Sequence, residues 1–192
     1  MEKAAEQIIA AVSALSPKSA PLLIAIDGRS AAGKTTLARI LNEKAGWIVF
    51  HTDDFFPRPE QRTPERLNTA GGNLDRERLL EEILIPLKNG ERQITHRAFD
   101  CRTKRLSEPI VTSVGEVCVI EGAYSCHPAL RDFYDLRVFL DIEPEEQSRR
   151  ILLRNGAEKA AQFAERWIPL EERYFAELRP QEKCEIFYMN RP

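Results

Sequence analysis

The sequence has no long apolar run, no excess of one charge and no pattern typical of a cleavable leader at residues 1–15, and each of these observations argues against a class of protein. No segment approaches the ~18 apolar residues of a membrane span, so we expect no membrane partner. With 28 basic and 30 acidic residues the net charge is −2, which gives no support for a nucleic-acid partner. The first residues, 1–15, carry acidic side chains and no small-residue cleavage site, so we expect a cytoplasmic protein.

Cysteine is also scarce and unpaired in the sequence. The four cysteines are Cys101, Cys118, Cys126 and Cys184, and none forms a CxxC pair. Cys118 lies in the middle of an apolar run that predicts a buried strand. Free thiols in a reducing compartment are therefore predicted, without a disulfide framework.

The order of apolar patterns predicts one α/β domain over residues 1–192. Short continuous apolar runs, typical of strands covered on both faces, occupy residues 22–26, 47–52, 117–120, 136–142 and 184–189. Helical spacing occupies 2–15, 34–45, 75–88, 128–133, 143–154 and 158–178, the last bent near Pro169. Residues 93–99 and 106–112 look extended, as in a hairpin. Strands separated by helices indicate a three-layer sandwich around a mostly parallel sheet.

A glycine-rich motif follows the first strand and opens the next helix. It reads Gly28, Arg29, Ser30, Ala31, Ala32, Gly33, Lys34 and Thr35, followed by Thr36, and it matches G-x-x-x-x-G-K-[ST]. Its glycines let the backbone curl so that successive N–H groups point at a phosphate, and the helix adds its positive end. Lys34 is then predicted to reach the β- and γ-phosphates of a nucleotide, and the Thr35 hydroxyl to bind Mg²⁺.

Acidic residues stand at the ends of two other predicted strands. Asp53 and Asp54 follow the strand at 47–52, and Glu121 follows the strand at 117–120. Ligands of open α/β sheets bind beyond the carboxyl ends of the strands, where the phosphate loop also lies. A phosphotransferase needs one carboxylate for the acceptor hydroxyl and another for the metal, so these acids are predicted to share one crevice with the loop.

Together these residues resemble the uridine kinase and phosphoribulokinase family of P-loop kinases. The similarity runs in order from about residue 20 to 190. It rests on the phosphate loop, the Asp53-Asp54-Phe55-Phe56 segment, Asn73-Leu74-Asp75, Ile120-Glu121-Gly122 and the helix Ser148–Arg154. The resemblance implies the fold of P-loop nucleoside triphosphate hydrolases. It also implies ATP and Mg²⁺ as cofactors and a small hydroxyl-bearing substrate.

Site residues follow from the resemblance position by position. Asp53 matches the catalytic aspartate that takes the proton of the attacking hydroxyl, and Asp75 an aspartate that holds ribose hydroxyls. Glu121 matches the strand-end acid near magnesium. Residues 55–112 match a substrate-side loop, helix and hairpin, and residues 150–167 a lid. The arginines expected to close over the phosphates are Arg149, Arg150 and Arg154.

The acceptor is left open at this stage. Phe99 stands at the position of the family's base-contacting tyrosine, and Arg102-Thr103-Lys104 stand where the family has a histidine. A nucleoside of the uridine or cytidine type is the first expectation, and pantothenate or a sugar the alternative. A nucleotide-dependent switch and a degenerate kinase that keeps ATP as a structural ligand are the competing classes. The guanine-specifying N-K-x-D of the switch class is missing from the sequence. Homo-oligomerisation stays undecided, and Trp167 and Tyr174 are expected to pack in the core at helical spacing.

Overall fold

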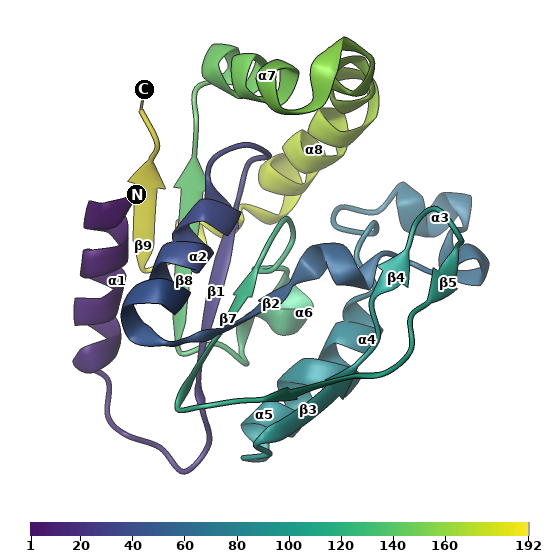
Figure 1. Ribbon diagram of the computed structural model, residues 1–192. Coiled ribbons are helices and arrows are strands. Elements are labelled where there is room, and N and C mark those ends of the chain that lie inside the picture. Colours follow the sequence, from purple (N-terminus) through teal and green to yellow (C-terminus); the bar gives the residue numbers. More distant parts are fainter. Residues whose placement is uncertain (192) are drawn as a thin grey trace.

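A five-stranded parallel sheet forms the centre of the computed structural model, which describes residues 1–191 (Figure 1). Its strand order is β2-β7-β1-β8-β9, and every neighbouring pair is parallel. The strands are β1 Leu22–Gly28, β2 Ile48–His51, β7 Val117–Glu121, β8 Leu136–Asp141 and β9 Ile186–Met189. The α/β fold predicted from the sequence is confirmed, and each strand falls on a predicted apolar run.

The register of the sheet brings the predicted site residues to one edge. Ile26, near the end of β1, pairs with Glu121 of β7, and Glu121 also pairs with His51 of β2. The phosphate loop leaves β1 directly after this level. Because parallel strands end on the same side, the loop, His51 and Glu121 open into the same crevice.

Helices cover both faces of the sheet in separate apolar clusters. On one face, α1 Glu2–Ser13 and α2 Lys34–Ala45 pack against side chains such as Ile24, Val119 and Val138. The opposite face buries Leu23, Phe139 and their neighbours under the helical segments described next. Successive side chains of a strand point to opposite faces, so both clusters use alternate residues of the same strands.

The helix predicted at 75–88 forms in three continuous pieces. They are α4 Arg76–Leu79, the π-helical turn η3 Leu80–Leu84 and α5 Ile85–Lys88. Asp75 caps the first piece, since its carboxylate accepts a hydrogen bond from Arg78 N. Pro86 lies inside the stretch and lacks an N–H, which accounts for a break in the regular hydrogen bonding.

The segment between β2 and β7 also carries short helices and two small antiparallel ladders. The helical turns are η1 Thr52–Phe55, η2 Pro59–Gln61 and α3 Pro64–Leu67. The ladders pair β3 Gln93–His96 with β6 Ile110–Ser113, and β4 Phe99–Asp100 with β5 Arg105–Leu106. The two extended segments predicted from sequence therefore pair with each other.

The chain after β7 builds the other wall of the crevice. Its elements are α6 Pro128–Arg131, α7 Pro144–Gln162, the π-helical turn η4 Phe163–Trp167, α8 Ile168–Leu178 and the turn η5 Pro180–Lys183. Gly156 interrupts α7 with φ 78° and ψ 170°, and the chain bends there. This break lies in the gap between the helices predicted at 143–154 and 158–178, so that division is confirmed, and Figure 1 shows α7 and α8 stacked above the end of the sheet.

All four cysteines are free thiols, as the sequence predicts. Cys101 is exposed, whereas Cys118 and Cys126 are buried. Burial raises the pKa of Cys118 to about 12. Half-buried Cys184 lies 3.7 Å from the Cys126 sulfur and 3.3 Å from Pro180 O. Over residues 1–191, no helix is long and apolar enough to cross a membrane.

Candidate active site

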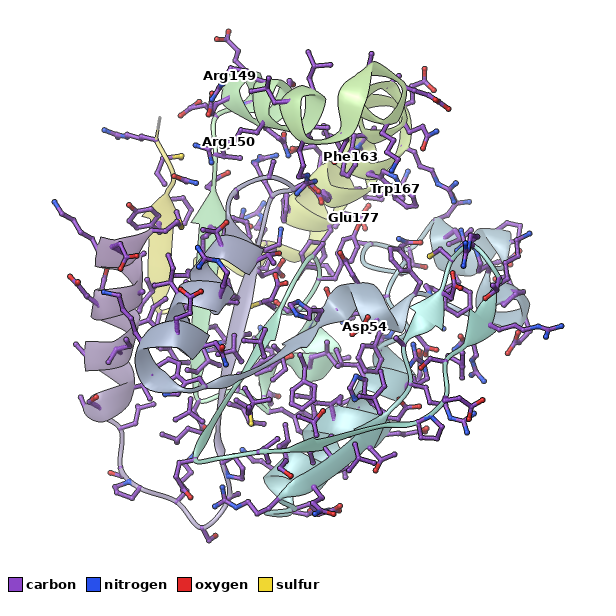
Figure 2. All side chains as sticks on the ribbon, viewed as in Figure 1. Asp54, Arg149, Arg150, Phe163, Trp167 and Glu177 are labelled. Carbon is purple, nitrogen blue, oxygen red and sulfur yellow. The ribbon has the colours of Figure 1, made fainter. Side chains whose placement is uncertain are left out.

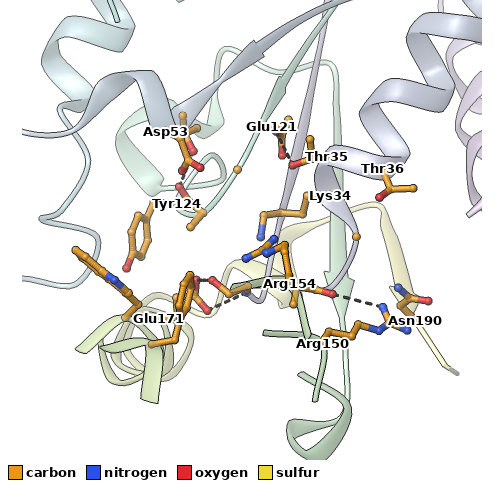
Figure 3. A pocket seen from close by; sticks show the side chains of 18 of the residues that line it. Lys34, Thr35, Thr36, Asp53, Glu121, Tyr124, Arg150, Arg154, Glu171 and Asn190 are labelled. Carbon is orange, nitrogen blue, oxygen red and sulfur yellow. Dashed lines mark hydrogen bonds between the residues drawn. The ribbon is translucent and has the colours of Figure 1, made fainter. Parts of the chain in front are cut away.

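A cavity of about 860 Å³ opens at the carboxyl ends of the strands (Figure 3). The phosphate loop and the start of α2 form one side, with Ser30, Lys34 and Thr35 in the wall. The turns after β2 and β7 supply Asp53 and Glu121. Residues of α7, η4 and α8 close the remaining side. Four segments that are far apart in the sequence therefore meet at the cavity.

The phosphate loop has the tight geometry that its motif predicts. A Cβ on Gly28 would lie 1.9 Å from Leu140 O, so only glycine fits beside β8. Ala31 has φ 63°, a left-handed conformation that costs a non-glycine residue energy and is concentrated at functional sites. Lys34 Nζ donates to Gly28 O at 2.8 Å and Arg29 O at 2.9 Å. The ammonium group thus lies inside the curl of the loop.

Asp27, directly before the loop, is fully buried and ties three segments together. Its carboxylate accepts hydrogen bonds from Gly28 N at 2.7 Å and from Tyr124 N and Cys126 N at 3.1 and 3.0 Å. Tyr174 of α8 donates its hydroxyl to the same carboxylate at 2.7 Å. Burial raises the pKa of Asp27, and these hydrogen bonds oppose the rise. Asp27 therefore fixes the loop after β7 and helix α8 relative to the phosphate loop.

Glu121 and Thr35 form an oxygen pair beside the loop. Thr35 Oγ1 lies 3.1 Å from Glu121 Oε1, and His51 Nδ1 lies 2.6 Å from the same oxygen. The hydrogen bond with Glu121 raises the pKa of His51. A hydroxyl and a carboxylate next to a phosphate loop suit Mg²⁺, which takes few protein oxygens together with phosphates and water. The residues present therefore fit the metal that the motif predicts.

Asp53 presents a carboxylate that is open to the cavity. It stands on η1, and no hydrogen bond joins its side chain to another residue of the described chain, 1–191. The Asp53 side chain is exposed to the open cavity, and partial desolvation by the surrounding walls, followed by the nearby Glu121 charge, raises its pKa. An unengaged carboxylate with a raised pKa can accept a proton from a ligand hydroxyl.

The three arginines of α7 have different surroundings, and Figure 2 shows two of them, Arg149 and Arg150. Arg150 and Arg154 line the cavity, and Arg150 Nη1 lies 3.4 Å from Ala31 O of the phosphate loop. Arg149 does not line it: its side chain is 59% exposed and pairs with Glu146 at 2.6 Å. Both Arg149 and Arg150 bind Glu146, whose pKa these hydrogen bonds lower to about 2. Two of the three predicted arginines thus face the cavity.

Comparison with known proteins settles the family. The sequence pattern described as the Phosphoribulokinase / Uridine kinase family matches residues 23–163, most of the chain. This chain belongs to the phosphoribulokinase/uridine kinase family. The match contains the phosphate loop, both strand-end acids and the arginines of α7, so the resemblance seen in the sequence is confirmed and the chain is a P-loop kinase of this family.

Relatives in the family are distant in sequence. The uridine kinase of Geobacillus kaustophilus is 26% identical over 83% of this chain and 77% of its own length. Uridine-cytidine kinase A of Dictyostelium discoideum is 27% identical over 72% of this chain, which spans 29% of that protein. A pantothenate kinase of Cutibacterium acnes is 29% identical over 66% of this chain and 45% of its own length. The structure of a possible uridine kinase from Bacillus stearothermophilus has a TM-score of 0.72 at 22% identity, covers 98% of this chain and 100% of its own, and so shares the fold.

Two residues matched to the family's substrate side lie outside the cavity wall. Asp75 is fully buried, and its carboxylate is 3.0 Å from Gln61 Nε2 and 3.3 Å from Arg78 Nε. Phe99 is buried in β4, opposite Leu106. In this structure Asp75 is hydrogen-bonded to other residues of the chain and Phe99 is buried, so neither side chain is available to a ligand in the cavity.

Other residues line the cavity without having been singled out for it from the sequence. Trp167, expected in the core, lines the cavity together with Phe56 and Phe163. Glu171 of α8 is 4% exposed and accepts hydrogen bonds from the phosphate loop. Tyr174, one turn further along α8, is fully buried, as predicted. Helical spacing identifies the apolar face of α8 but cannot reveal which part of the chain that face meets.

Proposed function

We propose that this family member transfers the γ-phosphoryl group of ATP to a hydroxyl of a small metabolite, with Asp53 as the base. The observation that carries the proposal is the Asp53 carboxylate, which makes no hydrogen bond or ion pair within residues 1–191 and opens into the cavity that also holds Lys34. Its raised pKa suits a group that accepts the proton of the acceptor hydroxyl.

The remaining site residues bind and orient. The loop from Gly28 to Thr36 cradles the phosphates through its N–H groups, and Lys34 supplies a positive charge to the β- and γ-phosphates. Thr35 and Glu121 hold Mg²⁺, which neutralises phosphate charge when bound. As the acceptor oxygen bonds to the γ-phosphorus, the bond to the β-phosphate oxygen breaks and ADP leaves. Arg150 and Arg154 offset charge on the transferred group.

A nucleoside of the uridine or cytidine type is our first candidate for the acceptor. Uridine kinases are among the relatives that align over most of the chain. The aromatic side chains Phe56, Phe163 and Trp167 in the cavity wall support a planar or apolar acceptor portion. In this proposal Asp75 accepts hydrogen bonds from the ribose hydroxyls. Phe99 and Arg149 contact the substrate only after the substrate-side segment and the lid rearrange.

Pantothenate is the second candidate, and the engagement of Asp75 favours it. Asp75 would have to leave Gln61 and Arg78 before a ribose diol could bind to it. Removing a partner from a buried charged group costs about 1–3 kcal/mol or more. An acceptor without a vicinal diol avoids that cost, and one relative of this chain is a pantothenate kinase.

The proposal is tested by measuring ADP release from ATP and Mg²⁺ with a panel of nucleosides, sugars and pantothenate. One acceptor should stimulate turnover, and Asp53→Asn should lower kcat by about 10²–10⁴-fold. Asp54→Asn is the matched control, since it removes the adjacent carboxylate, which does not line the cavity, and should retain turnover. Tight ATP binding without stimulation by any acceptor would instead favour a nucleotide-dependent switch.

A further inference from the structure

Side chains from one turn of helix α8 bind the phosphate loop. Glu171 binds Ser30, while Glu172 pairs with Arg29. Phe175 lies under the Arg29 guanidinium, 5.1 Å from its ring centre. The loop that should receive phosphates is therefore already held by the helix that follows the lid.

The Glu171 contact differs in kind from its neighbours because it uses a backbone N–H of the loop. Ser30 N donates to Glu171 Oε2 at 3.0 Å, and Ser30 Oγ donates to Oε1 at 2.5 Å. Glu171 is 4% exposed and lines the cavity (Figure 3). Burial raises the pKa of Glu171, and the charge of Lys34 and the two hydrogen bonds from Ser30 oppose that rise.

Backbone N–H groups of a phosphate loop donate hydrogen bonds to anions. A carboxylate bound to one of them therefore occupies a place that suits a phosphate oxygen. Helix α2 begins at Lys34, so we expect its first amides to face the phosphates nearer the nucleoside of a bound nucleotide. Ser30 stands four residues earlier in the loop. Of the three phosphates of ATP, the terminal γ-phosphate is then the one that meets Ser30 and Glu171.

We propose that Glu171 is an internal anion that competes with the γ-phosphate of ATP for the Ser30 amide and so determines the affinity for ATP relative to ADP. This inference rests on the proposed function only in that a nucleoside triphosphate binds the phosphate loop. When ATP binds, the Glu171 carboxylate leaves Ser30, so the contact between α8 and the phosphate loop changes when the γ-phosphate is present. When the γ-phosphoryl group has left, Glu171 binds Ser30 again.

Glu171→Gln tests the proposal, because glutamine keeps the length and the hydrogen-bonding capacity of the side chain and removes its charge. Calorimetric titration with Mg²⁺ and either a non-hydrolysable ATP analogue or ADP gives both dissociation constants. We expect the variant to bind the analogue about tenfold more tightly, as for the loss of one repulsive charge, and ADP within about twofold of the wild type.

Glu172→Gln is the matched control on the adjacent residue. Its carboxylate is 46% exposed and pairs with Arg29 outside the cavity wall, so the ratio of the two dissociation constants should not change. Ser30→Ala gives a second route if Glu171→Gln melts early: it removes one of the two bonds to Glu171 and should tighten analogue binding by about two- to threefold.

Two results would overturn the inference. If Glu171→Gln weakens the binding of both nucleotides equally, Glu171 is a structural support of the loop. If neither dissociation constant changes, Glu171 does not meet the γ-phosphate. The titrations need no acceptor, so they are separable from the proposed function. If the ratio shifts but no acceptor is phosphorylated, the inference about Glu171 is upheld and the proposed kinase function is contradicted.

Discussion

His51 and Glu121 show how one residue can set the behaviour of another at the end of a sheet. Their strands are neighbours in the sheet, and the 2.6 Å contact from His51 Nδ1 fixes the carboxylate oxygen that also meets Thr35. Partners of a metal-binding carboxylate orient it and tune its affinity for the metal. In the proposed function, His51 is thus a positioning residue for Mg²⁺.

Replacing His51 by alanine should raise the Mg²⁺ concentration for half-maximal turnover by about 10–100-fold, because Glu121 loses the group that orients it. Saturating Mg²⁺ should restore much of kcat. A titration of activity against Mg²⁺ measures both quantities. His127→Asn, a change outside the cavity wall, should leave the titration unchanged, and a purely structural His51 would lower kcat at every Mg²⁺ concentration.

At the residue scale, the sequence predicts a side chain of the site when its role depends on local spacing. Lys34 and Thr35 belong to one loop, and Asp53 and Glu121 directly follow apolar strands. Asp27 and Glu171 were not predicted because their partners are remote: Asp27 meets Tyr174 across 147 positions, and Glu171 meets Ser30 across 141. Only the folded chain brings such groups together.

Among the elements, α7 has the clearest departure from regular geometry. Gly156, with φ 78° and ψ 170°, separates the half that carries Arg150 and Arg154 from the half that leads to Phe163 and Trp167. Both halves contribute to the cavity wall. The kink therefore determines how residues 150–167 line the cavity.

Gly156→Ala should weaken ATP binding by about fivefold or more, since this conformation is essentially restricted to glycine and costs other residues about 1–3 kcal/mol. Calorimetry with the ATP analogue measures the loss. A Cβ at Gly156 meets nothing within 4 Å, so the cause is the backbone alone. Gly46→Ala is the control: it has φ 70° and similar open space at the end of α2, and should lower Tm while ATP affinity stays unchanged. Wild-type affinity in Gly156→Ala would show that the kink does not position the lid.

Regular elements were predictable to within a few residues where one pattern runs without interruption. The helix at Lys34–Ala45 and the strands of the sheet follow from apolar spacing. The π-helical turns at Leu80–Leu84 and Phe163–Trp167 did not follow. A π-helical turn adds one residue to a helical turn while the apolar pattern persists, so periodicity alone does not locate it.

At the scale of the whole molecule, His127 links stability to pH. His127 caps α6, since its Nδ1 accepts a hydrogen bond from Ala129 N at 3.1 Å, and its ring stacks on Tyr174. Burial, helped by the Arg76 charge, lowers the pKa of His127 to about 4. The unfolded chain has the ordinary histidine pKa of 6.5, so it binds this proton first as pH falls.

The contribution of neutral His127 to stability should be complete above pH 6.5 and disappear as pH falls towards about 4. Urea unfolding across this range measures it. His127→Asn retains a side chain that can cap the helix but does not titrate, so its free energy of unfolding should fall less steeply with acid than that of the wild type. Parallel pH profiles for the two proteins would contradict the assignment.

The distribution of thiols gives the folded protein a natural handle for spectroscopy. Cys101, in the turn between β4 and β5, is the exposed cysteine, whereas Cys118 and Cys126 are buried and half-buried Cys184 is hydrogen-bonded. A maleimide fluorophore therefore attaches preferentially at Cys101, on the substrate-side segment, without any engineered cysteine. Its emission can follow that segment in real time as nucleotide and acceptor are added.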